Sequence, residues 1–207
     1  MRGARFWEGR GLAGGEWGFY NGVMKARTKM SEAVRPEPGA LKLVVYPEPV
    51  LKKVAGDVHQ FDAWLAAVVE RMKDLMVENK GVGLAGPQVG LPLRIFVAAE
   101  SAKREDAKVY INPVLTDERG SEEGEEGCLS LPNIRIKVPR FTHVRVEALD
   151  ERGQPFAENL VDYAARIIQH ENDHLDGILL LDRMSPVAKL ANRRKVKELE
   201  ERKKAKN

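Results

Sequence analysis

Two histidines and a glutamate lie close together in the stretch Ala164–Gly177, which reads AARIIQHENDHLDG. His170 and His174 are four residues apart, so on a helix both imidazoles lie on one face, one turn apart. Glu171 lies about 100° further round, close enough to reach a metal-bound water without being a ligand. The pattern H-E-x-x-H therefore predicts a helix that binds a metal ion through two histidines.

Histidines at this spacing also occur by chance on solvent-exposed helices. The neighbouring residues favour a buried helix instead, because most are apolar: Ala164, Ala165, Ile167, Ile168 and Leu175. Two buried imidazoles with a carboxylate between them need polar partners, and a metal ion supplies them. This stretch alone indicates a metal site but not what the metal does.

The chain has a single cysteine, Cys128, in the segment Glu125–Pro132 (EEGCLSLP). A free cysteine is most often a small core residue. A two-histidine helix, however, lacks one protein ligand for a catalytic site, where three protein ligands leave one position open. Cys128, which we expect in a loop-like bend, is the candidate third ligand. The other histidines, His59 and His143, are predicted to lie in a surface-like segment and on the polar face of a strand.

Length and composition place limits on the kind of protein. A chain of 207 residues favours one domain with a sizeable core. No apolar run approaches the roughly 20 residues needed to span a membrane. One cysteine excludes an internal disulfide and fits a reducing compartment, so we expect a cytoplasmic protein.

Charge is distributed unevenly along the chain. Residues 1–30 carry six Lys/Arg and two Asp/Glu, and residues 186–207 carry nine and three, so the body between them is acidic. A basic tail can indicate a polyanionic partner such as RNA, or it can simply be solvated. We expect a disordered leader over 1–30, a catalytic domain over 31–185 and a basic C-terminal helix over 186–207.

The helices and strands that position the candidate site residues are predicted from apolar periodicity and from the placement of glycine and proline. Apolar residues at three- and four-residue spacing predict a helix over Phe61–Asn79. The glycine-rich segment Gly81–Gly90 is expected to be neither helix nor ordinary strand. Its G-x-G-x-x-G spacing follows a helix rather than a strand, which argues against dinucleotide binding. Short strands are predicted over Arg94–Ala98, Val109–Ile111, Ile134–Val138 and Val144–Leu149, and together these elements favour an α+β fold.

Three stretches in order, GVGLAGPQ, EGCLS and QHENDHLDG, resemble the signature motifs of peptide deformylases. The resemblance covers roughly Leu41–Ser185. It implies an α+β fold with a central H-E-x-x-H helix surrounded by antiparallel sheets, and removal of the formyl group from the N-terminal methionine of newly made polypeptides, which releases formate. One departure is Gly86, where the family usually has alanine; this removes a methyl group, and we expect it to be tolerated.

The resemblance also implies roles for individual residues. Cys128, His170 and His174 would hold one divalent ion, usually Fe(II) in this family, although zinc, nickel or cobalt can occupy the site. Glu171 would take a proton from water and pass it to the leaving amine. The Leu129 backbone N–H and the Gln88 side-chain amide would donate hydrogen bonds to the oxyanion.

Substrate and partner contacts follow from the same resemblance. The main chain at Val82 and Gly83 would lie against the substrate peptide as an added strand, and Arg135 could meet its main chain. Candidates for the methionine pocket are Val82, Leu129, Ile167 and the stem of Arg166. Glu126 is expected to pair with Arg140 and brace the cysteine segment. We further expect a monomer whose C-terminal helix holds it near the ribosome. The rival readings are a zinc peptidase and a non-catalytic metal-binding module.

Overall fold

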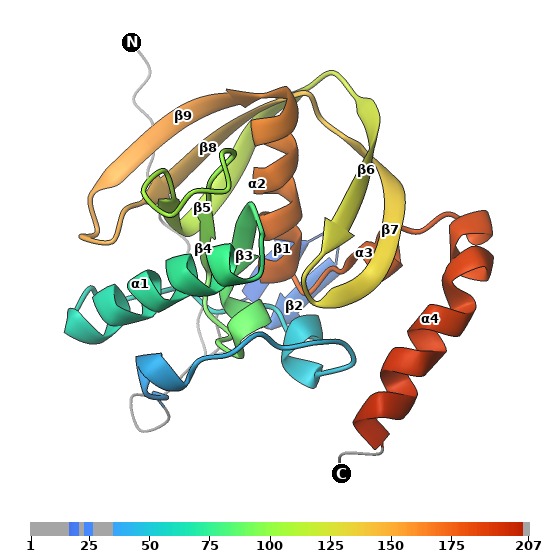
Figure 1. The fold of residues 1–207 in the computed structure, drawn as a ribbon. Helices are drawn as coiled ribbons and strands as arrows, with labels where there is room; N and C mark the ends of the chain where they lie inside the picture. The colour runs from blue at the N-terminus through green and yellow to red at the C-terminus, as the bar shows by residue number, and fades with distance from the viewer. Residues whose placement is uncertain (1–16, 21–22, 27–34, 205–207) are drawn as a thin grey trace.

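A computed structural model describes residues 17–20, 23–26 and 35–204 of the chain. Helix α2 (Asp162–Leu175) lies between a five-stranded antiparallel sheet and a separate two-stranded hairpin (Figure 1). The sheet has the order β3-β4-β5-β8-β9, with bounds Gly83–Ala85, Ile95–Ala98, Lys108–Arg119, His143–Leu149 and Pro155–Val161. The hairpin consists of β6 (Glu122–Cys128) and β7 (Leu131–Arg140). The predicted α+β fold is confirmed.

Helix α1 (Ala63–Glu78) covers one face of the sheet. It begins at Asp62, whose side chain accepts a hydrogen bond from the Leu65 backbone N–H at 2.9 Å and so caps the first turn. The prediction of a helix over Phe61–Asn79 is confirmed with slightly narrower bounds. Its apolar stripe enters the core as predicted: Leu65, Val68, Val69, Met72, Leu75 and Met76.

Helix α2 packs one apolar face against the sheet. Ala165 is fully buried, and Ile168 and Leu175 pack with Phe96 and other residues of the sheet. The helix ends before Gly177, whose φ of +69° belongs to the left-handed region that favours glycine. The predicted helix is therefore confirmed, although it begins two residues earlier than Ala164.

Cys128 lies in a strand and not in the loop-like bend predicted from the sequence. Cys128 is the last residue of β6 rather than part of a loop-like bend, and only Leu129 and Ser130 form the turn. The sequence of β6, EEGEEGC, has no apolar alternation and so gives no strand signal of its own. Its partner β7 does alternate, with buried residues at every second position from Ile134 to Arg140. Pairing with β7 therefore makes β6 a strand.

The glycine-rich segment also differs from the prediction. Gly83–Ala85 is strand β3, which pairs with β4, and Gly86–Val89 is a 3-10 helix. A Cβ on Gly86 would lie 2.7 Å from the Leu93 carbonyl oxygen and 3.0 Å from that of Leu91. Glycine at position 86 therefore lets the following chain pass close by, and the missing methyl would point at Leu91, Leu93 and the Ile95 side chain at the start of β4.

Several elements were not foreseen. Strand β9 and the short helix α3 (Leu180–Arg183) have no clear periodicity in the sequence. The predicted leader over 1–30 lies largely outside the described residues. Within it, β1 (Trp17–Tyr20) and β2 (Val23–Ala26) pair as antiparallel strands, and the expectation of a disordered leader over 1–30 stays a prediction.

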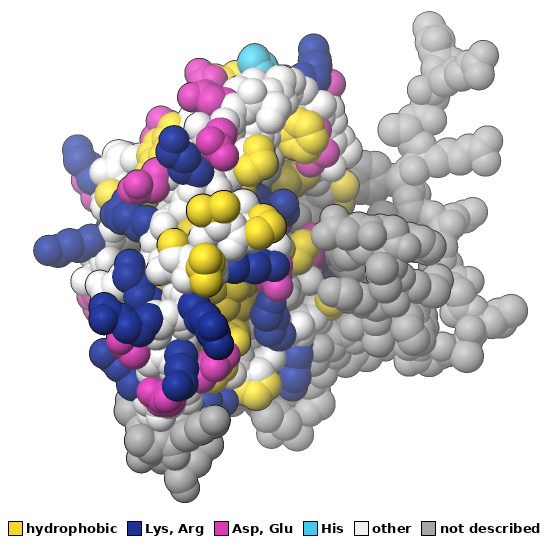
Figure 2. Space-filling view, turned by 90° about the vertical axis from the view of Figure 1, so that its right-hand side faces the viewer, with side chains coloured by type: hydrophobic (Ala, Val, Ile, Leu, Met, Phe, Trp, Pro, Cys, Tyr) yellow, Lys and Arg dark blue, Asp and Glu magenta, His cyan; other side chains and the backbone are white. Residues whose placement is uncertain are grey.

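Helix α4 (Pro186–Lys204) lies within the basic C-terminal helix predicted over 186–207, and the Ser185 hydroxyl accepts a hydrogen bond from the Ala188 backbone N–H at 3.2 Å. Leu199 packs against β7, whereas Val187 and Leu190 are exposed. Lys and Arg side chains gather on the face of the molecule that carries this helix (Figure 2). Among the described residues, no helix has the length and apolar character required to cross a membrane.

Candidate metal centre

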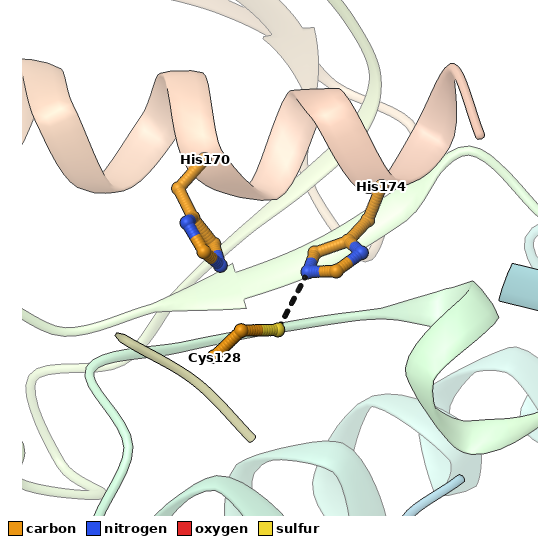
Figure 3. Close-up of side chains that lie close together, drawn as sticks. All are labelled: Cys128, His170 and His174. Carbon is orange, nitrogen blue, oxygen red and sulfur yellow. Dashed lines mark hydrogen bonds between the residues drawn. The ribbon is translucent and has the colours of Figure 1, made fainter. Parts of the chain in front are cut away.

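The cysteine and the two histidines predicted as ligands come together between β6 and α2. One ligand atom from each of Cys128, His170 and His174 lies within 4.8 Å of the other two. The Cys128 Sγ is 3.3 Å from the His174 Nε2, and both imidazoles point from α2 towards the sulfur (Figure 3). A thiolate and two imidazoles are a donor set for zinc and other transition metals, and three protein ligands leave a position for water.

The His170 imidazole is held by a network of buried charges. Its Nδ1 lies 3.0 Å from the Glu126 Oε2, which leaves Nε2 on the side of the sulfur. Arg140 donates two hydrogen bonds to the same carboxylate, at 2.9 and 3.0 Å, and a third to Asp173 at 2.7 Å. The predicted pair of Glu126 and Arg140 is therefore confirmed. A carboxylate bonded to the outer nitrogen of a histidine ligand fixes its tautomer and orientation.

The protonation properties of the two histidines suit a cation between them. Burial lowers the pKa of His174 well below its usual range, which keeps the imidazole neutral and able to bind a metal. Burial also lowers the pKa of His170, but hydrogen bonds to Cys128 and Glu126 outweigh burial and raise the pKa above its usual value. The His170 site thus attracts positive charge, which a metal ion can supply in place of a proton.

Glu171 is buried beside the two histidines, on the side of strand β3. Burial raises the pKa of its carboxyl to about 7. Among the described residues its Oε2 has no hydrogen-bond partner. Its Oε1 lies only 2.3 Å from where a Cβ on Gly83 would be, so the carboxylate packs directly against the glycine backbone. A carboxyl with a pKa near 7 can both accept and return a proton at neutral pH.

Gln88 is the polar side chain that the 3-10 helix turns towards the sulfur. Its Oε1 accepts a hydrogen bond from the Ala85 backbone N–H at 2.8 Å, which orients the amide. The Nε2 is then directed to the Cys128 Sγ at 3.5 Å and the Ser130 Oγ at 3.4 Å. Leu129 follows the cysteine and lines the cavity described below, together with Gln88. An oriented amide donor beside the three ligand atoms can stabilise a developing negative charge.

A cavity of about 660 Å³ opens onto these side chains, and all the predicted substrate-binding residues line it: Val82, Gly83, Arg135, Arg166 and Ile167. They contribute differently. Arg135 is an exposed side chain that pairs with Glu125 at 3.2 Å. Arg166 is 13% exposed, and its guanidinium bonds to Glu126 and to backbone carbonyls, so only its stem remains for a ligand.

Comparison with known proteins identifies the family. The profile of the polypeptide deformylase family matches residues 40–190. The peptide deformylase of Desulfotalea psychrophila is 38% identical, over 76% of this chain and 95% of that protein. The peptide deformylase of Thermus thermophilus is 44% identical, over 68% of this chain and 80% of that protein. The crystal structure of the Plasmodium falciparum enzyme matches with a TM-score of 0.77 and 39% identity, over 79% of this chain and 98% of that one.

The chain belongs to the polypeptide deformylase family. It is a metal-dependent hydrolase that removes the formyl group from the N-terminal methionine of newly synthesised polypeptides.

Some residues of this deformylase site were missed by sequence reasoning. Asp173 binds Arg140 and also Arg183. It lies three residues after His170, so the helical spacing could have placed it on the same face. Tyr163 and Ser130 were also missed. Tyr163 lines the cavity one turn before Ile167, and Ser130 follows the cysteine by two residues.

Proposed function

We propose that Cys128, His170 and His174 hold the metal ion with which this deformylase hydrolyses the formyl amide. The observation that carries the proposal is the convergence of the three ligand atoms within 4.8 Å, from two elements far apart in the sequence. An ion held by these three residues would supply Lewis-acid chemistry, lowering the pKa of water bound to it towards neutrality. The neutral His174 and the carboxylate-bound His170 are suited to this role.

Glu171 moves the proton in this proposal. Its carboxyl, with a pKa of about 7, takes the proton of the attacking water and passes it to the nitrogen of the departing amine. Gly83 allows the Glu171 carboxylate to pack against the backbone of strand β3, because glycine has no side chain to occupy that space. Formate and a polypeptide with a free amino group are the products.

Gln88 and Leu129 stabilise the oxyanion that forms on the formyl carbon. The Gln88 amide is oriented by the Ala85 N–H before substrate arrives, so no reorganisation is needed during the reaction. The Leu129 backbone N–H is the second donor. Removal of one such donor typically costs about 3 kcal/mol of transition-state stabilisation.

The substrate lies along the cavity with its main chain beside β3. β3 is an edge strand, so the main chain at Val82 and Gly83 can bond an extended peptide on the side away from β4. The Val82 carbonyl is not part of this edge, because it accepts from the Ala99 N–H at 2.8 Å. The methionine side chain contacts Val82, Leu129, Ile167 and the stem of Arg166, which form a largely apolar surface. Arg135 at the rim meets the main chain further along the peptide.

The metal ion in the native enzyme is Fe(II) in this proposal. A thiolate ligand donates more charge than oxygen or nitrogen and suits a softer ion than an all-oxygen site does. Metal analysis of protein purified without oxygen, paired with formate release from formyl-Met peptides, tests it. Iron with high formate release is expected. An internally cleavable peptide is the control substrate: cleavage of that peptide without formate release would refute the proposed function.

We further propose that α4 (Pro186–Lys204), within the predicted C-terminal segment 186–207, is a docking helix beside the catalytic domain of residues 31–185. A monomeric enzyme in the cytoplasm uses this helix to bind the ribosome. The support is the basic surface on the face of the molecule that carries α4 (Figure 2). On this helix the side chains of Arg193 and Arg194 are exposed. The test is salt-dependent cosedimentation with ribosomes. Charge reversal at both arginines should weaken it without changing formate release from free peptides; unchanged cosedimentation refutes the proposal.

A further inference from the structure

Helix α2 and strand β6 face each other with matched spacing. Four residues of helix rise about 6 Å and two residues of strand rise about 6.7 Å, so every fourth helix residue can stay opposite every second strand residue. His174 lies opposite Cys128, and His170 lies opposite Glu126. One turn earlier, Arg166 lies opposite Gly124. The two ligand-bearing elements are therefore joined by three opposing pairs.

The pair of Arg166 and Gly124 contains no proposed metal ligand. Arg166 donates hydrogen bonds to the Glu126 Oε1 at 2.9 Å, to the Val138 carbonyl at 2.9 Å and to the Glu122 carbonyl at 2.8 Å. These acceptors belong to both strands of the hairpin. The planar guanidinium thus fixes α2 to β6 and β7 together, in a geometry that a lysine ammonium cannot reproduce.

Gly124 provides the space for this guanidinium. A Cβ at position 124 would lie 2.8 Å from the Arg166 Cζ and 2.8 Å from its Nη2. Alternation along β6 puts positions 124, 126 and 128 on one face, so the glycine leaves a gap in the same row as Glu126 and Cys128. The arginine fills that gap.

We infer that the guanidinium of Arg166 is a positioning group for the metal centre, in addition to the substrate contact proposed for its stem. It sets the register between α2 and the hairpin, and so the distance between the sulfur and the two imidazoles. The inference rests on the proposed ligand set. The Glu126 carboxylate carries the effect, because one of its oxygens accepts from Arg166 and the other lies against His170. Partners of ligating residues act on metal affinity in this way.

The test uses the full chain loaded with Co(II), whose absorption bands report the ligand geometry, in unsubstituted, Arg166→Met and Gly124→Ala forms. Methionine keeps an apolar stem in the cavity and removes the guanidinium. The alanine leaves Arg166 in the chain but displaces it. Arg145→Met is the charge control, because the Arg145 guanidinium bonds to Glu147 of its own strand, at 3.1 Å. Gly39→Ala is the glycine control, since nothing lies within 4 Å of the added Cβ.

Both test variants should shift the cobalt bands. Loss of a partner of a metal ligand typically lowers metal affinity about 10-fold or more, so Co(II) release to a chelator should be about 10-fold faster. The kcat for formyl-Met peptides should fall while KM stays unchanged, and the double variant should be no worse than Arg166→Met. If Arg166→Met does not fold, the cobalt spectra and release rates of Gly124→Ala decide the outcome.

Two outcomes overturn the inference. Unchanged cobalt spectra and release rates in both variants would show that Arg166 does not position the ligands. A raised KM with unchanged metal properties would leave Arg166 with a role in substrate binding only. If the unsubstituted chain shows neither a sulfur-to-cobalt absorption band nor formate release, the proposed ligand set fails, which is a different result from either of these.

Discussion

Gly83→Ala tests the placement of Glu171 without touching the carboxylate itself. The added Cβ would lie 2.3 Å from the Glu171 Oε1, 2.7 Å from its Cδ and 2.8 Å from its Cγ. Carbon does not approach these atoms so closely, so the side chain must move by about 1 Å or more to reach ordinary van der Waals separation. A displacement of that size in a reacting group can lower the rate about 100-fold.

The cost in stability should be smaller than the cost in activity. Gly83 has no positive φ, so alanine fits the backbone and stabilises the protein by about 0.4–1 kcal/mol through the unfolded chain. Overpacking typically costs about 1–3 kcal/mol. The free energy of unfolding should therefore fall by no more than about 3 kcal/mol, while kcat falls about 100-fold or more.

The assay measures formate release, metal content and urea unfolding for Gly83→Ala, with Gly39→Ala as the matched control. Metal content should stay unchanged, because the added methyl is directed at Glu171 and not at a ligand. In an Glu171→Ala background the same substitution should have little further effect on kcat. A Gly83→Ala variant with the kcat of the unsubstituted chain would refute the position assigned to the Glu171 carboxylate.

Other predictions concern the remaining groups of the site. Glu171→Ala should keep its metal and lose about 100- to 10,000-fold in kcat; retained formate release would defeat its role as base. Cys128→Ala should lose metal, which elemental analysis would show, and full occupancy would contradict the ligand assignment. Gln88→Ala should lower kcat about 100- to 1,000-fold with metal retained; a normal kcat would remove its role. Hydrogen bonds with His170 and Arg140 outweigh burial and lower the pKa of Glu126 from 4.5 to about 2. The metal-free protein should therefore lose about 3 kcal/mol of stability as pH falls from about 4.5 to 2, and Glu126→Gln should flatten that dependence in urea titrations.

Much of the site could be predicted because its residues carry unusual chemistry at fixed spacing. His170 and His174 are set by the geometry of one helix, and a single cysteine leaves no choice of sulfur. Helical spacing could have placed Asp173 on the face of His170, but neither its pairing with Arg140 nor the contact of Arg166 with Gly124 could be predicted in the same way. They depend on which strand face opposes the helix, and that is decided by tertiary packing.

The strands were harder to predict than the helices for a physical reason. α1 buries a regular apolar stripe, so its own sequence indicates it. β3 is buried at all three positions, which removes the alternation expected of a strand, and β6 is rich in glutamate and glycine. Both become strands through hydrogen bonding to a neighbour, β4 or β7. Pairing of this kind is not visible in a short stretch of sequence.

The separation of the proposed ligands along the chain has a consequence for the lifetime of the protein. Cys128 and His174 are 46 residues apart, so a shared cation links two distant segments much as a disulfide would in a secreted protein. With one cysteine, the chain cannot form that covalent bridge by itself. An ion that binds only the folded form shifts the unfolding equilibrium according to its free concentration. Scarcity of the ion should therefore expose the protein to degradation as well as slow its turnover.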